Sequence, residues 1–333
     1  MSADRQLSRS VDEIFQSEIF SRAECHFVRC GSLTLSLKFA SPDLADIFLP
    51  SFLSGDDQRA DLTVAVAGAK DVDLSGIVPV PRDRPRTFAG EAGYAAWQPG
   101  EKDVLSLLNF ESKRALIWLP QDAPPAWYAS RPGLPLVHAL TKDTAWSAVH
   151  GGCVGREGRF LLLAGKGKSG KTTASLACAR AGWDYAGDDF VFANTDTGQV
   201  EPLFATARLR ITAASEFTGL LNTAAELSHD DGDARHELRL GGAFGQHRLR
   251  GGKIAAILLP RRLGSERPVF SSARRSDAFA ALLPHTSVGL LGWPDKTTRK
   301  VAALVEKAPA FFVDTGTTPN YIPDAFRDFL DRV

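Results

Sequence analysis

Residues 160–192 read FLLLAGKGKSGKTTASLACARAGWDYAGDDFVF and carry the most informative pattern in the chain. The apolar run at 160–164 has the length of a buried strand, and it leads into GKGKSGKT at 165–172, a complete G-x-x-x-x-G-K-[ST] motif. Residues 172–181 are rich in Ala and Leu and predict a helix, which Gly182 would end in a left-handed conformation. A second strand is expected next, carrying Asp188 and Asp189.

The motif is typical of a phosphate-binding loop. Its glycines let the backbone turn tightly and aim N–H groups inward, and the helix N-terminus behind them adds to the attraction for anions. Lys171 is expected to reach the β- and γ-phosphates, and the Thr172 hydroxyl to bind Mg²⁺. A glycine-rich turn that binds nothing is the alternative, but the strand–loop–helix context favours binding. We therefore expect ATP and Mg²⁺ as ligands, with the nucleotide held by Gly165, Lys166, Gly167, Lys168, Ser169, Gly170, Lys171, Thr172 and Thr173.

Composition narrows the class of protein. The 333 residues include 39 basic and 39 acidic side chains, so no strong basic field indicates a nucleic-acid partner. No apolar run reaches the ~18 residues of a membrane span, and the first 15 residues lack the apolar core of a signal peptide. The four cysteines form no C-x-x-C motif and are expected to be buried or incidental thiols. We expect a cytoplasmic protein without nucleic-acid or membrane partners, and a homo-oligomer is left open.

The periodicity divides the chain at about residue 140. Residues 1–140 are expected to form a mostly β region with a role in substrate recognition left open, and 141–333 to form an α/β core around the loop. Within the first part, residues 1–24 look loosely attached, and residues 71–100 should be irregular because prolines interrupt them. Residues 25–39 are predicted to contain a half-buried strand, with residues 25–30 as its hairpin partner and a turn near Gly31 and Ser32. A further strand is predicted at 61–67, a second hairpin at 104–120, and short helices at 41–48 and 134–140. Trp127 and Tyr128 either close a core edge or stack on a base or partner.

The core alternates strands and helices. A strand at 145–154 carries His150 and should pair antiparallel with the strand before the loop. Residues 228–235 are polar and are expected to form a loop, either a lid or a plain solvated loop. Arg208 and Arg210 alternate on a strand, so both would point to one side, as candidates for phosphate or carboxylate contacts or as plain surface residues. Further strands are predicted at 200–211, 253–259 (ended by Pro260) and 309–313, and helices at 212–221, 276–283 and 323–330.

The position of the carboxylates indicates the kind of nucleotide site. The apolar run at 254–259 ends in Pro-Arg-Arg, without the carboxylate usual in motor and transporter ATPases. Asp188 and Asp189 form the acidic pair that follows the loop, on a strand expected beside the strand at 160–164. One carboxylate can then bind Mg²⁺ while the other accepts a proton from an attacking hydroxyl. The alternative is a pair that caps a turn.

Three segments carry a family resemblance: VHGG at 149–152, GKGKSGKTT at 165–173 and ARAGWDYAGDDFVF at 179–192. Together they resemble the HPr serine kinase/phosphorylase family, and still more the shorter HPr-kinase-like proteins of peptide-tailoring pathways, such as lasso-peptide precursor kinases. The resemblance implies a P-loop α/β core related to phosphoenolpyruvate carboxykinase on a mixed sheet. It also implies ATP-dependent phosphorylation of a serine hydroxyl on a peptide or protein.

The resemblance also implies roles for individual residues. Lys171 and Thr172 would hold the phosphates and Mg²⁺, Asp188 and Asp189 would supply metal binding and the general base, and His150 would approach the transferred phosphate. Asp188 joins Thr172 as the expected metal ligand. The Ile-Arg-Gly-Leu-Gly-like signature of the family is missing, and ARLRI at 207–211 stands in that region. HPr itself as substrate, and the reverse phosphorolysis, are therefore in doubt.

The sequence thus predicts a peptide or protein serine kinase. A small-molecule kinase is the first alternative, because such enzymes also carry acids on the strand after the loop helix. A nucleotide-binding regulatory module is the second. The chain has neither an LSGGQ nor an N-K-x-D motif, which disfavours transporter and GTPase switches.

Overall fold

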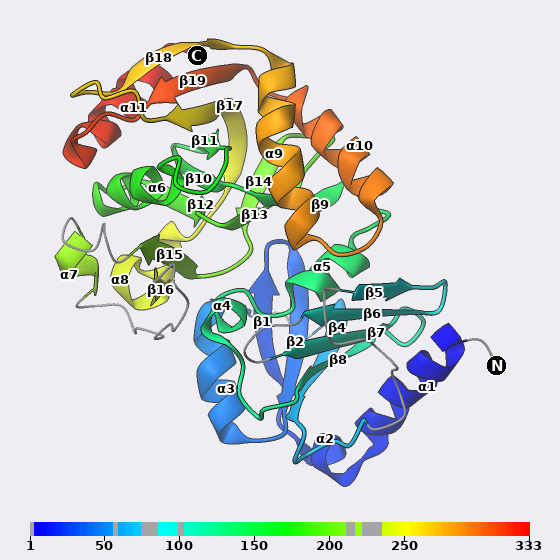
Figure 1. Ribbon diagram of the computed structural model, residues 1–333. Coiled ribbons are helices and arrows are strands. Elements are labelled where there is room, and N and C mark those ends of the chain that lie inside the picture. The colour runs from blue at the N-terminus through cyan, green and yellow to red at the C-terminus, as the bar shows by residue number, and fades with distance from the viewer. Residues whose placement is uncertain (1–2, 56–58, 75–85, 99–102, 211–216, 222–234) are drawn as a thin grey trace. The chain divides into compact units, whose positions relative to one another are not determined.

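The computed structural model describes residues 3–55, 59–74, 86–98, 103–210, 217–221 and 235–333 (Figure 1). The chain forms two compact units. Unit 1 is Met1–Lys142 with Leu290–Pro294, and unit 2 is Asp143–Gly289 with Asp295–Val333. Each unit is built on its own large mixed sheet, so the N-terminal region does not extend the sheet of the core.

Unit 1 contains an eight-stranded sheet in the order β3-β1-β2-β4-β8-β7-β6-β5. The pairs β2/β4 and β4/β8 are parallel and the other pairs are antiparallel. The strands are β1 (His26–Cys30), β2 (Leu33–Phe39), β3 (Leu53–Ser54), β4 (Leu62–Gly68), β5 (Arg86–Ala89), β6 (Gly93–Gln98), β7 (Val104–Asn109) and β8 (Arg114–Leu119). The helices are α1 (Ala3–Gln16), α2 (Glu18–Arg22), α3 (Pro42–Phe48), η1 (Leu49–Ser51), α4 (Ala126–Ala129) and α5 (Leu134–Leu140).

The first helices belong to the core of unit 1, so the expectation of a loosely attached segment at 1–24 is wrong. Helix α1 packs on β6, β7 and β8. Leu7, Val11 and Ile14 recur at helical spacing and are buried, while Arg9 stays exposed and pairs with Glu13. The buried side chains join a cluster that also contains Phe20, Trp97, Leu105 and Leu116.

Most of the short-range predictions for unit 1 are confirmed. The first hairpin turns at Gly31 and Ser32, and the second pairs β7 with β8. Residues 71–100 are not irregular throughout, because β5 and β6 form an antiparallel pair there; residues 75–85 and 99–100 lie outside the described ranges. The prolines that motivated the expectation flank these strands. Tyr128 closes the core, since it is 1% exposed and its hydroxyl accepts the N–H of Gly133.

Unit 2 contains a nine-stranded mixed sheet. Its main path runs β12-β10-β11-β17-β14-β13-β9, and β19 extends it by pairing with both β17 and β18. The pairs β11/β17 and β17/β19 are parallel. The strands are β9 (Trp146–His150), β10 (Gly152–Arg156), β11 (Arg159–Leu163), β12 (Asp184–Gly187), β13 (Phe190–Asn194), β14 (Gln199–Pro202), β17 (Gly252–Arg261), β18 (Val269–Ala273) and β19 (Ala310–Asp314). A separate two-stranded ladder joins β15 (Thr206–Arg210) and β16 (Arg235–Arg239).

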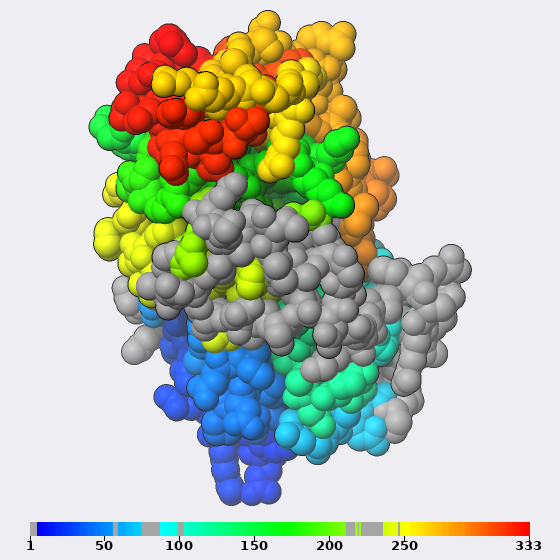
Figure 2. Space-filling view, turned by 60° about the vertical axis from the view of Figure 1, so that its left-hand side comes forward, coloured from blue at the N-terminus to red at the C-terminus, as the bar shows by residue number. Residues whose placement is uncertain are grey.

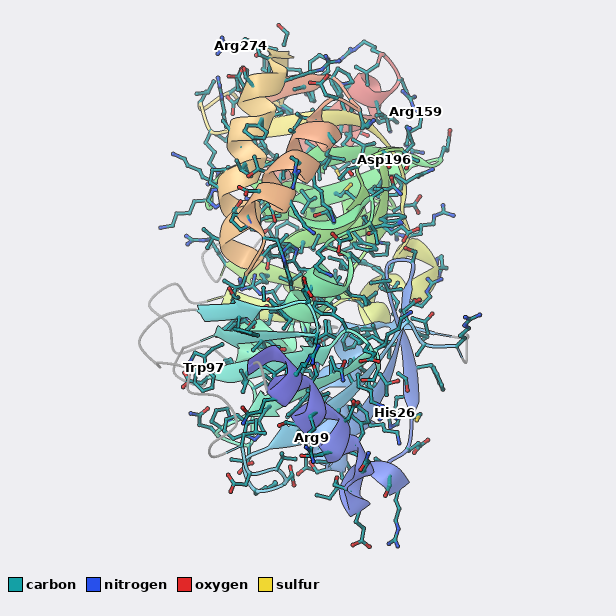
Figure 3. The ribbon with its side chains drawn as sticks, turned by 90° about the vertical axis from the view of Figure 1, so that its right-hand side faces the viewer. Arg9, His26, Trp97, Arg159, Asp196 and Arg274 are labelled. Atoms are coloured by element: carbon teal, nitrogen blue, oxygen red, sulfur yellow. The ribbon has the colours of Figure 1, made fainter. Side chains whose placement is uncertain are left out.

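Helices cover both faces of this sheet (Figure 1). One side holds α6 (Lys171–Arg180) and α11 (Ile322–Leu330), and the other holds α9 (Arg275–Gly289) and α10 (Pro294–Val305). Phe270 of β18 stacks on Phe329 of α11 at 4.3 Å, and Figure 2 shows these gold and red segments side by side. Arg274, labelled in Figure 3, precedes α9 and pairs with Asp277. The remaining short elements are α7 (Thr218–Leu221), α8 (Gly241–Phe244), η3 (Gln246–Arg248) and η4 (Pro319–Tyr321).

Four boundaries in unit 2 differ from the predictions. The strand region expected at 200–211 is divided into β14 and β15, which belong to different sheets. The single strand expected at 145–154 is broken at Gly151, which lies between β9 and β10. Strand β17 continues through Pro260, because β11 pairs only as far as Leu258 and Pro260 therefore costs no ladder hydrogen bond on that side. Helix α9 runs through Pro284 to Gly289, beyond the predicted end at 283. Most residues of the polar loop predicted at 228–235, and residues 212–216 of the predicted helix, lie outside the described ranges.

No disulfide joins the four cysteines, all of which lie in the described ranges, and Cys30, Cys153 and Cys178 are buried. Among the described residues, no helix is both long enough and apolar enough to cross a membrane.

Candidate active site

The loop of the phosphate-binding motif connects β11 to α6, as the sequence predicts. Three residues of this loop have a positive φ angle: 154° at Gly165, 69° at Lys168 and 106° at Gly170. The ammonium of Lys171 is buried under the loop, where it donates to the carbonyls of Gly165 (2.7 Å) and Lys166 (3.2 Å). The loop is therefore folded around the side chain that the motif assigns to phosphate.

Two glycines allow close packing around the loop and its helix. A Cβ on Gly170 would lie 3.3 Å from the hydroxyl of Thr315, which follows β19. A Cβ on Gly152 of β10 would lie 2.4 Å from the hydroxyl of Ser175, so the glycine lets α6 sit close to the sheet. Lys166 and Lys168 are exposed at the loop surface, and the Ser169 hydroxyl is buried without a hydrogen-bond partner.

Asp188 lies beside the start of α6. It is 3% exposed, and its carboxylate accepts hydrogen bonds from the Tyr185 hydroxyl (3.2 Å), the Arg208 amide (3.3 Å) and the Thr172 hydroxyl. Burial, followed by the charge of Asp189, raises the pKa of Asp188 to about 6, and these three hydrogen bonds oppose the rise. The two residues predicted as metal ligands, Thr172 and Asp188, thus lie in direct contact.

The acidic pair reaches this position by a route different from the predicted one. Asp188 and Asp189 occupy a bend between β12 and β13 and are not within a strand. Strand β12 pairs with β10, so it is not the neighbour of β11 that we expected. The strand between β11 and β12 is the upstream β10, because the hairpin that precedes the loop occupies that edge of β11.

Asp189 faces His150. Its Oδ1 lies 3.4 Å from His150 Nδ1, and the two side chains are 19% and 18% exposed. His150 ends β9, which pairs with β13, so this histidine is not on the strand beside β11 as predicted. Because Phe190 is the register partner of His150, the ladder itself brings the residue before Phe190 next to the imidazole. The Gly151 N–H also donates to the Asp189 carbonyl (3.0 Å).

Arg208 of β15 contacts both acids. Its amide donates to Asp188, and its guanidinium Nη1 lies 3.8 Å from Asp189 Oδ2. Its Nε donates to Glu237 of β16 at 2.6 Å, and the Glu237 side chain is 1% exposed. Burial disfavours the charge of Arg208, but Glu237 and then Asp189 outweigh it and raise the pKa of the guanidinium. The role predicted for Arg210, two residues further along the strand, stays a prediction.

Two further residues of the site were missed by the sequence analysis. Glu237 directly opposes Arg208 in the β15/β16 ladder, but it follows the polar stretch at 228–235 and has no motif around it. His285 of α9 lies with its ring 5.4 Å from that of His150. The helix predicted at 276–283 stops before Pro284, whereas α9 continues through this proline and thereby includes His285.

The oxygen donors of Thr172 and Asp188 fit a Mg²⁺ ion that is also held by phosphate and water. Among the described residues, no group of three or more His, Cys, Asp or Glu side chains is arranged to hold a metal ion. Mg²⁺ in nucleotide sites usually keeps several waters and takes one or two protein ligands together with phosphate oxygens. The Thr172 hydroxyl and the Asp188 carboxylate meet this requirement.

Comparisons with known proteins show a distant structural similarity. No protein-family model matches the chain, and no curated protein matches it in sequence. Among solved structures, the chain is similar to the Hpr(Ser) kinase/phosphatase from Coxiella burnetii, with 11% sequence identity and a TM-score of 0.30. The alignment covers 56% of this chain and 97% of that protein.

Proposed function

We propose that the chain is an ATP-dependent phosphotransferase that moves the γ-phosphate to a serine hydroxyl of a peptide or protein. The observation that carries the proposal is the meeting of the phosphate-binding loop with an acidic pair, through the contact of Thr172 with Asp188. The serine acceptor rests on the resemblance of residues 145–192 to HPr-kinase-like proteins. Recognition of the peptide by residues 1–140 stays a prediction.

In this proposal the loop and its lysine hold the nucleotide. The loop amides and the Lys171 ammonium would bind the β- and γ-phosphates of ATP. Thr172 and Asp188 would hold Mg²⁺, which neutralises charge on the phosphate oxygens when bound. The buried Asp188 suits this role, because it lies against Thr172 and three hydrogen bonds fix its carboxylate.

Asp189 is the group proposed to accept the proton. Its side chain is 19% exposed, so a substrate hydroxyl can reach it, whereas Asp188 is 3% exposed. As the serine oxygen forms its bond to the γ-phosphorus, the bond to the bridging oxygen of ADP breaks and the hydroxyl proton passes to Asp189. His150 and Arg208 flank the same carboxylate and orient it. His150 would also face the transferred group.

The test is transfer of label from γ-labelled ATP with Mg²⁺. Serine-containing peptides and a panel of hydroxyl metabolites are offered separately as acceptors. We expect label on peptide serine, and a loss of about a hundredfold or more in Lys171→Ala, because one charged donor to the transition state is removed. Lys307→Ala, at an exposed lysine of unit 2, is the matched control and should keep the rate. Label on metabolites alone would indicate a small-molecule kinase. ATP binding without transfer to any acceptor would indicate a regulatory module.

A further inference from the structure

Helix α9 contributes a second histidine to the site. His285 lies near its C-terminal end, with its ring 5.4 Å from the ring of His150 and tilted by 38°. The neighbouring Thr286 is fully buried, and its hydroxyl accepts the His150 N–H at 3.1 Å. The backbone of β9 is thus tied to α9 one residue from His285. This fixes the position of His285 in the site.

Titratable side chains approach His285 from β9 and from the start of α6. His150 faces it from β9, and the Lys171 ammonium acts on it from the start of α6. Asp189 lies against His150, 3.4 Å from its Nδ1. Burial, followed by the charge of Lys171, lowers the pKa of His285. The imidazole is therefore neutral at pH 7 and keeps one N–H that can donate without adding a charge beside the lysine.

Lys171 marks the place of the terminal phosphates in the proposed function. His285 packs beside His150, and the charge of Lys171 acts on its imidazole. Both of these neighbours are groups assigned to the transferred phosphate in the proposed function. We propose that His285 donates a hydrogen bond to the terminal phosphate of bound ATP and so helps the site to distinguish ATP from ADP. This inference rests on the proposed nucleotide-binding function. Its alternative is a histidine that only packs against His150.

A matched pair of variants separates the two roles. His285→Asn keeps a side-chain donor and His285→Leu removes it, while both have a similar size. Dissociation constants for ATP and ADP are measured with Mg²⁺ by titration calorimetry on the full chain. We expect the wild type to prefer ATP. The Leu substitution should weaken the affinity for ATP about tenfold and leave the affinity for ADP nearly unchanged. The Asn substitution should retain most of the wild-type affinity for ATP.

Two further substitutions serve as controls for changes in helix α9 that do not concern the proposed hydrogen bond. Val288→Ala changes an exposed residue of the same helix and should leave both constants unchanged. If the Leu variant does not fold, His285→Phe retains an aromatic ring against His150 without a donor, and the same comparison applies.

Equal losses for ATP and ADP, or no loss for either, would overturn the contact with the terminal phosphate and leave the proposed function standing. So would equal affinities of the wild type for the two nucleotides. A wild type that binds neither nucleotide would overturn the proposed function together with this inference.

Discussion

The adjacent residues Asp188 and Asp189 have different surroundings in the candidate site. Asp188 is buried and accepts three hydrogen bonds, while Asp189 is partly exposed and lies against His150 and Arg208. Desolvation favours protonation of Asp188, whereas the Asp189 side chain is 19% exposed to solvent. In the proposed function, these different surroundings assign metal binding to Asp188 and proton acceptance to Asp189.

The substitution Asp189→Asn tests the assignment of Asp189 as the proton acceptor. The variant should bind ATP as the wild type does and lose about 10²–10⁴-fold in the rate of phosphate transfer, because the proton acceptor is removed while the phosphate loop is untouched. Single-turnover transfer and an ATP titration measure the two properties. Asp196→Asn, in an exposed turn of unit 2, is the control. A variant with the full transfer rate would show that Asp189 is not the base.

At the level of elements, the end of β19 holds the chain segment that leaves β17. Asp314 is 6% exposed and accepts the amides of Leu263 (3.2 Å), Ser265 (3.0 Å) and Gly316 (3.3 Å), together with the Ser265 hydroxyl. Burial raises the pKa of Asp314, but the hydrogen bonds from Ser265 and these amides outweigh it and lower the pKa below its usual value. The next residue, Thr315, packs against Gly170 of the phosphate loop. The hydrogen bonds of Asp314 therefore help to hold the segment that contacts the phosphate loop.

Asp314→Asn should lower the free energy of unfolding by about 1–3 kcal/mol at pH 7, since an amide cannot accept all four donors. The folded pKa lies below the unfolded value of about 3.9, so the stabilisation is complete above that pH and is lost as the pH falls through the folded pKa. The difference between wild type and variant should therefore shrink on acidification. Urea unfolding at pH 7 and near pH 3 measures it, with Asp331→Asn as the exposed control. A difference that does not depend on pH would contradict the assignment.

At the scale of the whole molecule, each unit has its own sheet and its own buried cluster. Residues 3–22 contribute to the cluster of unit 1, in which Phe20 is fully buried together with side chains of α1. The segment Leu290–Pro294 also belongs to unit 1, although the helices before and after it cover the sheet of unit 2. No periodicity in the sequence indicates this return of the chain.

Phe20→Ala should destabilise unit 1 by about 3–5 kcal/mol, because a large buried ring is replaced by a cavity. Ile19→Ala, in the same helix but 40% exposed, is the matched control and should have little effect. Hydrogen exchange resolves the effect by element, with loss of protection expected in β6 and β7 and with β11 and β17 of unit 2 as the internal reference. Unchanged protection in β6 and β7 would restore the view of a loosely attached segment.

Local sequence patterns predict the local features of this protein correctly. The strand–loop–helix around Lys171, the hairpins of unit 1 and the left-handed Gly182 all follow from patterns within a few residues, because backbone sterics and side-chain periodicity act locally. The strand that lies beside β11, and the positions of Glu237 and His285 at the site, become apparent only in the folded chain. These placements depend on ladder pairing and helix packing between residues far apart in the chain, and no local pattern encodes them.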